Sequence, residues 1–213
     1  MATSTAVANP RLNDLPPVPA MAAEGSSRLE PVEKAPDFGT RMAYWWSRKE
    51  FGKVMTPIKV VCARMPGSMK ALGGMLKFSG RGIHLDQELQ VLIGNLASQI
   101  NGCASCIDLG RMAAVKGHLD LAKVEAVTDY RRNSKFSERE RAALAYVEEA
   151  TRNKGVSDTT FAALRTHFNE REIVEITWVN AFQNFFNLLN RPLGIGSDGL
   201  CAIAQAKASS QRP

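Results

Sequence analysis

Apolar residues recur at helical spacing along most of the chain, and no stretch keeps the strict alternation of a half-buried strand. The clearest predicted helix begins at Asp86 and ends at Asn101-Gly102. Its apolar face is formed by Leu89, Leu92, Ile93, Leu96 and Ile100. We therefore predict an all-α fold.

Prolines, glycines and capping residues set the other helix boundaries. Helices are expected over residues 40–54, from Pro57, and after Pro66-Gly67 up to the glycines at 80 and 82. Another should start at Cys103 and end at Gly117, followed by a short one over about 120–131.

Capping residues predict three more helix starts. Ser137 with Glu140 and Asn169 with Glu172 match the capping-box spacing, and Ser157 is expected to cap a helix between them. The last long helix should end near residue 190, before a glycine-rich turn and a polar tail.

The first 38 residues differ from the rest of the chain. Six of the ten prolines lie at positions 10, 16, 17, 19, 31 and 36, where each removes a backbone donor and disfavours helix. We expect an extended arm over 1–38, held on its own domain or on a neighbouring subunit, and a helical domain over 39–213.

Composition and charge limit the cellular compartments and the binding partners that we expect for this protein. The 213 residues suit one domain, 45% of them are hydrophobic, and no apolar run is long enough for a membrane span or a signal core. We expect a cytoplasmic protein with no membrane partner.

The net charge of +6 is concentrated in residues 41–83, which contain nine basic residues and a single acidic residue, Glu50. Aromatic and aliphatic residues interleave with these cations as on solvated helices, and no nucleic-acid motif is present, so we predict no nucleic-acid partner.

The candidate chemistry lies in Cys103 and Cys106. A Cys-x-x-Cys pair at a helix N-terminus suits redox work, because unpaired N–H groups stabilise the reactive thiolate and one helical turn lets the two sulfurs bond. Half of a zinc site, or two thiols without chemistry, are the alternatives. No second paired motif supplies further zinc ligands, and Cys62 and Cys201 are expected to be ordinary buried thiols.

The context of this pair resembles the carboxymuconolactone decarboxylase and alkylhydroperoxidase D family over roughly residues 57–193. The matching motifs are Leu85-Asp86, Gln99-Ile100-Asn101-Gly102-Cys103, Cys106-Ile107-Asp108, Phe136-Ser137-Glu138-Arg139-Glu140 with Ala142-Ala143-Leu144-Ala145, Glu172-Ile173-Val174-Glu175-Ile176-Thr177 and Asn187-x-x-Asn190-Arg191. The resemblance implies an alkylhydroperoxidase D-like helical fold, homo-oligomers (dimers, trimers or hexamers), and a thiol-dependent peroxidase or disulfide reductase without metal or organic cofactor.

The resemblance also implies roles for the two thiols. Cys106 would attack a hydroperoxide and Cys103 would resolve the product, with a protein or small-thiol reductant restoring both. Helix electrostatics alone favour Cys103 as the attacking group, because it lies nearer the N-terminus.

Two positions depart from the family pattern. The histidine four residues after the second cysteine is replaced by Gly110, and the glutamate twelve residues before the first cysteine by Val91. Asp108 and Glu88 are the candidates in the sequence for rebuilding the proton relay. An acidic residue in a first helical turn is also favoured by the helix dipole without any catalytic role.

Other polar residues admit a structural or a functional interpretation. His167 is expected to be a helix-end residue rather than a base. A stripe of Asn180, Asn184, Asn187 and Arg191 is expected to join helices by hydrogen bonds, and otherwise to form a polar wall of the pocket.

Three functions therefore stay open. The first is a thiol-dependent antioxidant oxidoreductase. The second is a cofactor-free decarboxylase or isomerase of a small lactone or organic acid, suggested by the missing relay residues. The third is a noncatalytic oligomeric binding protein that uses the basic segment 41–83.

Overall fold

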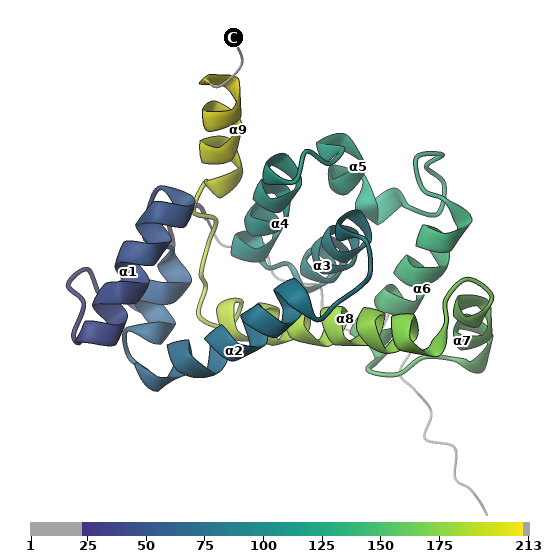
Figure 1. The fold of residues 1–213 in the computed structure, drawn as a ribbon, viewed down its shortest axis with the longest axis horizontal. Coiled ribbons are helices and arrows are strands. Elements are labelled where there is room, and N and C mark those ends of the chain that lie inside the picture. The colour runs from purple at the N-terminus through teal and green to yellow at the C-terminus, as the bar shows by residue number, and fades with distance from the viewer. Residues whose placement is uncertain (1–22, 211–213) are drawn as a thin grey trace, which may run out of the picture.

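The computed structural model describes residues 23–210, and all regular elements in that range are helical (Figure 1). The π-helix η2 and the 3-10 helix η3 accompany nine α-helices in the described range. In chain order the elements are α1 (Phe38–Phe51), η2 (Ile58–Cys62), α2 (Gly67–Arg81), α3 (Gln87–Asn101), α4 (Ala104–Lys116), α5 (Leu121–Glu125), η3 (Val127–Asp129), α6 (Glu138–Asn153), α7 (Asp158–Arg165), α8 (Glu170–Asn190) and α9 (Leu200–Ser210). The all-α prediction is confirmed.

Helix α3 lies at the centre of the molecule, in contact with α4, α6 and α8 (Figure 1). Leu89, Leu92 and Ile93 of its predicted apolar face are at most 1% exposed, and they share one core with Leu144 of α6 and Ile176 of α8. Burying a side chain of this size contributes about 1.5–3 kcal/mol. The preceding loop, α3 and the turn into α4 are therefore fixed by the main core.

Capping residues define the helix starts as predicted. Both expected capping boxes form, Ser137 with Glu140 at α6 and Asn169 with Glu172 at α8. The Asp86 carboxylate accepts the Leu89 N–H at 2.7 Å and begins α3. These local signals are satisfied within a few residues of chain, which is why the sequence predicts them well.

A buried carboxylate ties the loop before α3 to α8. Glu175 accepts hydrogen bonds from the backbone N–H groups of His84 (2.9 Å) and Leu85 (3.1 Å) and from Arg171 Nε (2.9 Å). Burial alone would raise the pKa of Glu175, but these hydrogen bonds outweigh it and lower the pKa. Glu175 is therefore ionised at neutral pH and anchors the entry to the central helix.

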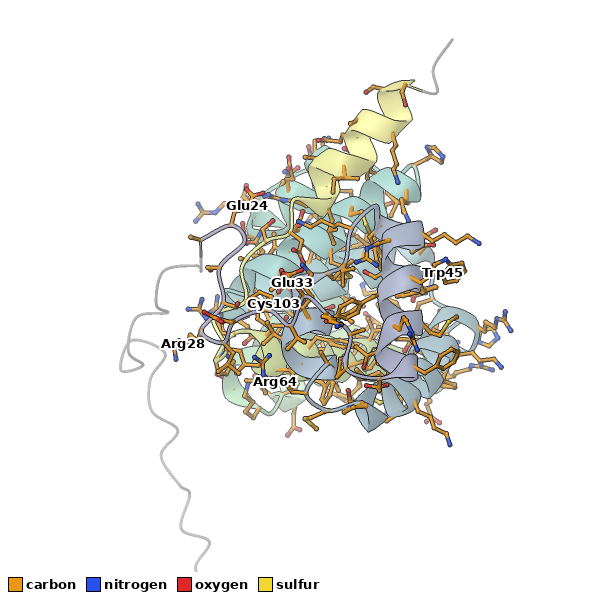
Figure 2. All side chains as sticks on the ribbon, turned by 90° about the vertical axis from the view of Figure 1, so that its left-hand side faces the viewer. Glu24, Arg28, Glu33, Trp45, Arg64 and Cys103 are labelled. Atoms are coloured by element: carbon orange, nitrogen blue, oxygen red, sulfur yellow. A yellow bond between two sulfur atoms is a disulfide. The ribbon has the colours of Figure 1, made fainter. Side chains whose placement is uncertain are left out.

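The described part of the N-terminal arm, residues 23–37, contains no helix or strand and lies on its own domain. Backbone hydrogen bonds of 2.8–2.9 Å join residues 25–28 to residues 193–197, and Lys59 forms an ion pair with Glu33 at 2.8 Å. Figure 2 shows Glu24, Arg28 and Glu33 along one side of the molecule. The remainder of the predicted arm, residues 1–22, lies outside the described residues.

Three predicted boundaries are corrected by the structure. Helix α1 runs over 38–51 rather than 40–54, because Gly52 adopts a left-handed conformation (φ 83°) and ends it. The helix expected over 120–131 is divided into α5 and η3. The predicted polar tail was wrong, since residues 200–210 form α9, with Leu200 and Ala204 buried.

No helix within residues 23–210 combines the length and the apolar character needed to cross a bilayer.

Candidate functional site

Cys103 and Cys106 lie at the turn between α3 and α4. Gly102 adopts a left-handed conformation (φ 63°) that ends α3, and Cys103 is the N-cap residue of α4. The two cysteines form a disulfide with their Cα atoms 5.3 Å apart, inside the usual range for such a bond. The pair is thus close enough to alternate between dithiol and disulfide.

The turn that carries the cysteines is held from α8. Arg191, just after α8, donates from Nη1 to the Gly102 carbonyl at 2.8 Å. Asn101 Nδ2 donates to Asn184 Oδ1 at 2.8 Å, and Ser98 Oγ to Asn187 Oδ1 at 3.2 Å. These bonds fix the backbone immediately before Cys103.

The polar stripe on α8 therefore serves mainly to join helices, as expected. Asn180 Oδ1 also accepts from Thr151 Oγ1 of α6 at 3.0 Å.

The two sulfurs differ in their access to a cavity in the described part of the chain. A cavity of about 420 Å³ lies between α1, η2, α2, α3, α4 and α8, and Cys106 lines it while Cys103 does not. Cys103 is only 1% exposed, against 6% for Cys106. An incoming small molecule therefore meets Cys106 first.

The cavity wall is strongly apolar. Its polar lining residues are Ser79, Gln87, Gln90, Asn95, Ser105, Gln183 and Asn190. Among the described residues that form the wall, none is an acid, a base or a histidine. Helix α2 contributes Met69, Leu72 and Leu76, although none of its residues is buried. A cavity of this size and character suits an uncharged organic molecule.

Two buried asparagines contact Cys106 and its neighbour Ile107. Asn190 Nδ2 donates to Cys106 Sγ at 3.6 Å, and Asn95 Nδ2 donates to the Ile107 carbonyl at 3.5 Å. The carbonyl oxygens of both side chains, Asn95 Oδ1 and Asn190 Oδ1, have no hydrogen-bond partner in the described part of the chain. The wall next to Cys106 is therefore built from amides.

Comparison with known proteins shows which proteins this chain is similar to. No protein-family model matches the sequence. The uncharacterized protein YnjA of Escherichia coli strain K12 is 28% identical over 182 residues, which cover 84% of this chain and 99% of YnjA. A crystal structure of an Agrobacterium tumefaciens protein of unknown function, provisionally named as the antioxidant defence protein AhpD, is 28% identical with a TM-score of 0.58, covering 62% of this chain and 91% of that chain. The chain is therefore similar in sequence and in fold to alkylhydroperoxidase D-like proteins.

Two further structures share the fold at lower identity. An uncharacterized peroxidase-related protein of Ralstonia eutropha JMP134, described as an alkylhydroperoxidase AhpD core, is 19% identical with a TM-score of 0.72 over 86% of this chain and 98% of its own. A cysteine-to-alanine variant of the debrominase Bmp8, in complex with 2,3,4-tribromopyrrole, is 19% identical with a TM-score of 0.71 over 87% of this chain and 99% of its own. The fold is therefore shared with a debrominase as well as with an uncharacterized peroxidase-related protein.

Relative to the alkylhydroperoxidase D-like pattern, the position of the missing histidine is filled from another helix. A Cβ atom on Gly110 would lie 2.8 Å from Asn95 Nδ2, closer than side chains pack. Gly110 and Asn95 both line the cavity, as does Val91, which stands in the place of the glutamate. The amide of Asn95 thus occupies the space that a side chain at position 110 would need.

Asp108, predicted to take part in the relay, faces away from the cavity. Its carboxylate accepts the backbone N–H groups of Asp198 (3.1 Å), Leu200 (2.8 Å) and Cys201 (2.9 Å). These donors lie at the start of α9, where an anion is favoured. The structure does not bring Asp108 to the cavity wall, and its contacts are those of a residue that anchors α9.

Glu88 is also engaged elsewhere. It forms an ion pair with Lys123 at 2.7 Å, and Lys123 pairs with Glu140 at the same distance. Glu88 is absent from the residues that line the cavity in the described chain. We therefore retain neither Glu88 nor Asp108 in the reaction proposed below.

The remaining thiols and histidines lie apart from the pair. Cys62 is buried and lines the cavity, whereas Cys201 is only half-buried, which corrects the expectation of two buried thiols. Burial raises the pKa of both thiols, so they are poor nucleophiles at neutral pH. His167 is exposed at the end of α7 and does not reach the cavity.

Sequence reasoning missed Asn95 and did not single out Asn190 beyond the family motif. The available signal for Asn95 was a polar residue within the otherwise apolar stretch 91–97 of α3. No group of three or more potential metal ligands occurs within residues 23–210.

Proposed function

We propose that this protein is a thiol-dependent oxidoreductase that reduces organic hydroperoxides with Cys106 as the attacking thiol and Cys103 as the resolving thiol. The observation that carries the proposal is the bonded pair at the start of α4, of which Cys106 alone lines the cavity. This difference in access favours Cys106 over Cys103, against the order expected from helix electrostatics. The family relationship supports the same assignment.

The reaction proceeds in three balanced steps. The Cys106 thiolate attacks the terminal oxygen of the hydroperoxide, the O–O bond breaks, and the alkoxide leaves and takes up the proton that the thiol released. The Cys103 thiol then condenses with the Cys106 sulfenic acid to form the disulfide and water. A dithiol reductant returns two electrons and two protons by thiol–disulfide exchange.

The first turn of α4 supports the thiolate. Cys106 lies within this turn, where unpaired N–H groups and the helix dipole stabilise negative charge. The Asn190 amide donates to the same sulfur at 3.6 Å. Both contributions favour the ionised thiol over the neutral one, in a wall without a charged partner among the described residues.

The test is the single replacement of each cysteine by serine, with Cys201→Ser as the matched control outside the cavity. We expect Cys106→Ser to abolish reduction of cumene hydroperoxide. Cys103→Ser should reduce one equivalent of peroxide per chain and then stop, with a sulfenic acid that dimedone traps. Cys201→Ser should turn over at the wild-type rate. Full turnover by both Cys103→Ser and Cys106→Ser would refute the proposal.

A second candidate is reductive debromination, favoured by the fold shared with debrominase Bmp8 and by the uncharged wall of the cavity. An aryl bromide and the dithiol would yield the reduced arene, the disulfide, bromide and a proton. Release of bromide from 2,3,4-tribromopyrrole by the reduced protein, lost in Cys106→Ser, distinguishes this activity.

The decarboxylase or isomerase hypothesis finds no support in the cavity. A carboxylate substrate needs a cationic or strongly donating site, and no Lys, Arg or His is among the described lining residues.

A further inference from the structure

We propose that the side chains of Asn95 and Asn190 form a hydrogen-bonding subsite for the single polar group of an otherwise apolar, uncharged ligand, and hold that group beside Cys106. The inference rests on the proposed function and names the class of substrate: a bulky neutral organic hydroperoxide, or a neutral molecule with one O–H or N–H donor. Because the inference concerns binding, ligand affinity can test it without any catalytic turnover.

The first observation is that the two amides are buried and incompletely bonded. Asn95 is 1% exposed and Asn190 5% exposed, and each has a carbonyl oxygen without a partner among residues 23–210. Buried polar groups are nearly always paired, so an unpaired acceptor on a cavity wall indicates a donor supplied by a ligand or by water.

The second observation is that the amide groups are held in one orientation. The Nδ2 group of Asn190 donates to Cys106 Sγ, and the Nδ2 group of Asn95 donates to the Ile107 carbonyl. In the disulfide-bonded protein, rotation of either amide by a half turn would place its oxygen against an atom that cannot donate. The atom without a partner on both side chains is therefore the carbonyl oxygen, which favours a donor on the ligand.

The third observation is that the chain makes room for this arrangement. Gly110 faces Asn95 across the α3–α4 interface, and any side chain at this position would displace the amide. The subsite thus depends on three residues from three segments: Asn95 on α3, Gly110 on α4 and Asn190 at the end of α8.

The rest of the cavity excludes charge. Trp46, Ile58, Leu72, Phe182 and Phe186 line it, and no charged side chain within the described residues joins them. An anionic ligand would lose its hydration without gaining a counter-charge, which is strongly unfavourable. The subsite therefore selects a neutral donor attached to an apolar body.

The test is isothermal titration of the oxidised, disulfide-bonded protein with three probes of the same shape: 4-tert-butylphenol, its methyl ether 4-tert-butylanisole, and 4-tert-butylbenzoate. We expect the phenol to bind about tenfold more tightly than the ether, the effect of about 1.4 kcal/mol of hydrogen bonding. The benzoate should show no measurable binding. Equal affinity for phenol and ether, tighter binding of the benzoate, or no binding of the phenol by the folded wild type would each overturn the proposal.

The variants assign the preference to the two amides. Asn95→Leu and Asn190→Leu should bind the ether as well as the wild type but lose most of the preference for the phenol. The matched control is Asn101→Leu, which removes a half-buried amide from the same helix as Asn95, away from the cavity, and should keep the preference. Should a leucine variant fail to fold, Asn95→Ser and Asn190→Ser give the same comparison. An unchanged phenol preference in both the Asn95 and the Asn190 variants would refute the subsite.

The outcome is independent of peroxidase activity. A phenol preference that depends on both amides, together with no hydroperoxide reduction, would keep the subsite and reject the proposed reaction. Normal hydroperoxide reduction with equal binding of phenol and ether would keep the reaction and reject the subsite.

Discussion

The role of Asp108 can be decided by its replacement, because the sequence suggests a part in proton transfer and the structure shows an anchor. The carboxylate accepts three backbone N–H groups at the start of α9, and two of these belong to Asp198 and Leu200, which are 5% and 2% exposed. Asp108→Ala leaves both buried donors without an acceptor. Cys201 is half-buried, so water can replace the third bond.

The expected magnitude follows from these contacts. Each unpaired buried donor costs about 1–3 kcal/mol, so Asp108→Ala should lower the free energy of unfolding by about 4 kcal/mol. For a domain of this size that corresponds to a fall in Tm of roughly 10 °C. Asp108→Asn keeps one oxygen and the size of the side chain, and it should cost about 1–2 kcal/mol because one of the three bonds is lost.

The assay combines chemical denaturation with hydrogen exchange at the Leu200 and Cys201 amides. We expect faster exchange in Asp108→Ala and a smaller effect in Asp108→Asn, with the rate of disulfide formation by peroxide unchanged in the folded fraction of both variants. Wild-type stability together with a large loss of thiol reactivity would refute the anchoring role and restore the catalytic one.

Two further predictions concern the glycine beside the amides and the carboxylate before α3. Gly110→Ala should lower the free energy of unfolding by about 1–3 kcal/mol, as overpacking does, and should weaken the preference for 4-tert-butylphenol. Wild-type stability together with an unchanged ligand preference would show that the amide of Asn95 can move aside without cost. Because the folded pKa of Glu175 is depressed, its contribution to stability is present above the unfolded pKa of about 4.3 and is lost as the pH falls below that value toward the folded pKa. In urea titrations, Glu175→Gln should therefore be less stable than wild type at pH 7, with a gap that narrows as the pH falls toward 3, and a gap independent of pH would contradict this explanation.

Local sequence signals predicted the fold well wherever the hydrogen bonds that define a helix end lie within one short segment. The capping boxes at Ser137 and Asn169 and the end of α3 at Gly102 depend on residues only a few positions apart. The failure at α9 has a different origin. Its first turn is stabilised by Asp108, about ninety residues earlier in the chain, and its buried face packs on α4. No pattern within residues 197–213 reports such a contact.

In the candidate site too, local features could be predicted from the sequence and tertiary contacts could not. The Cys-x-x-Cys spacing and the helix start predicted the bonded pair, because both are properties of one short segment. The surroundings of the sulfur depend on which side chains three other elements bring to it. The loss of the histidine at Gly110 is visible in the sequence, but its replacement by an amide from α3 is a tertiary contact. Proximity in sequence suggested Asp108 and Glu88 instead, and the packing turns both away.

Helix α2 gives the cavity an incomplete wall. Its apolar side chains Met69, Leu72 and Leu76 line the cavity, yet none of its fifteen residues is buried. A ligand that fills the cavity would make apolar contacts with these side chains, in the way that residues of the hydrophobic core do in a fully packed helix. Contacts between a bound ligand and α2 would then stabilise the packing of this helix against the rest of the domain, so occupancy of the cavity and the stability of α2 would be thermodynamically linked.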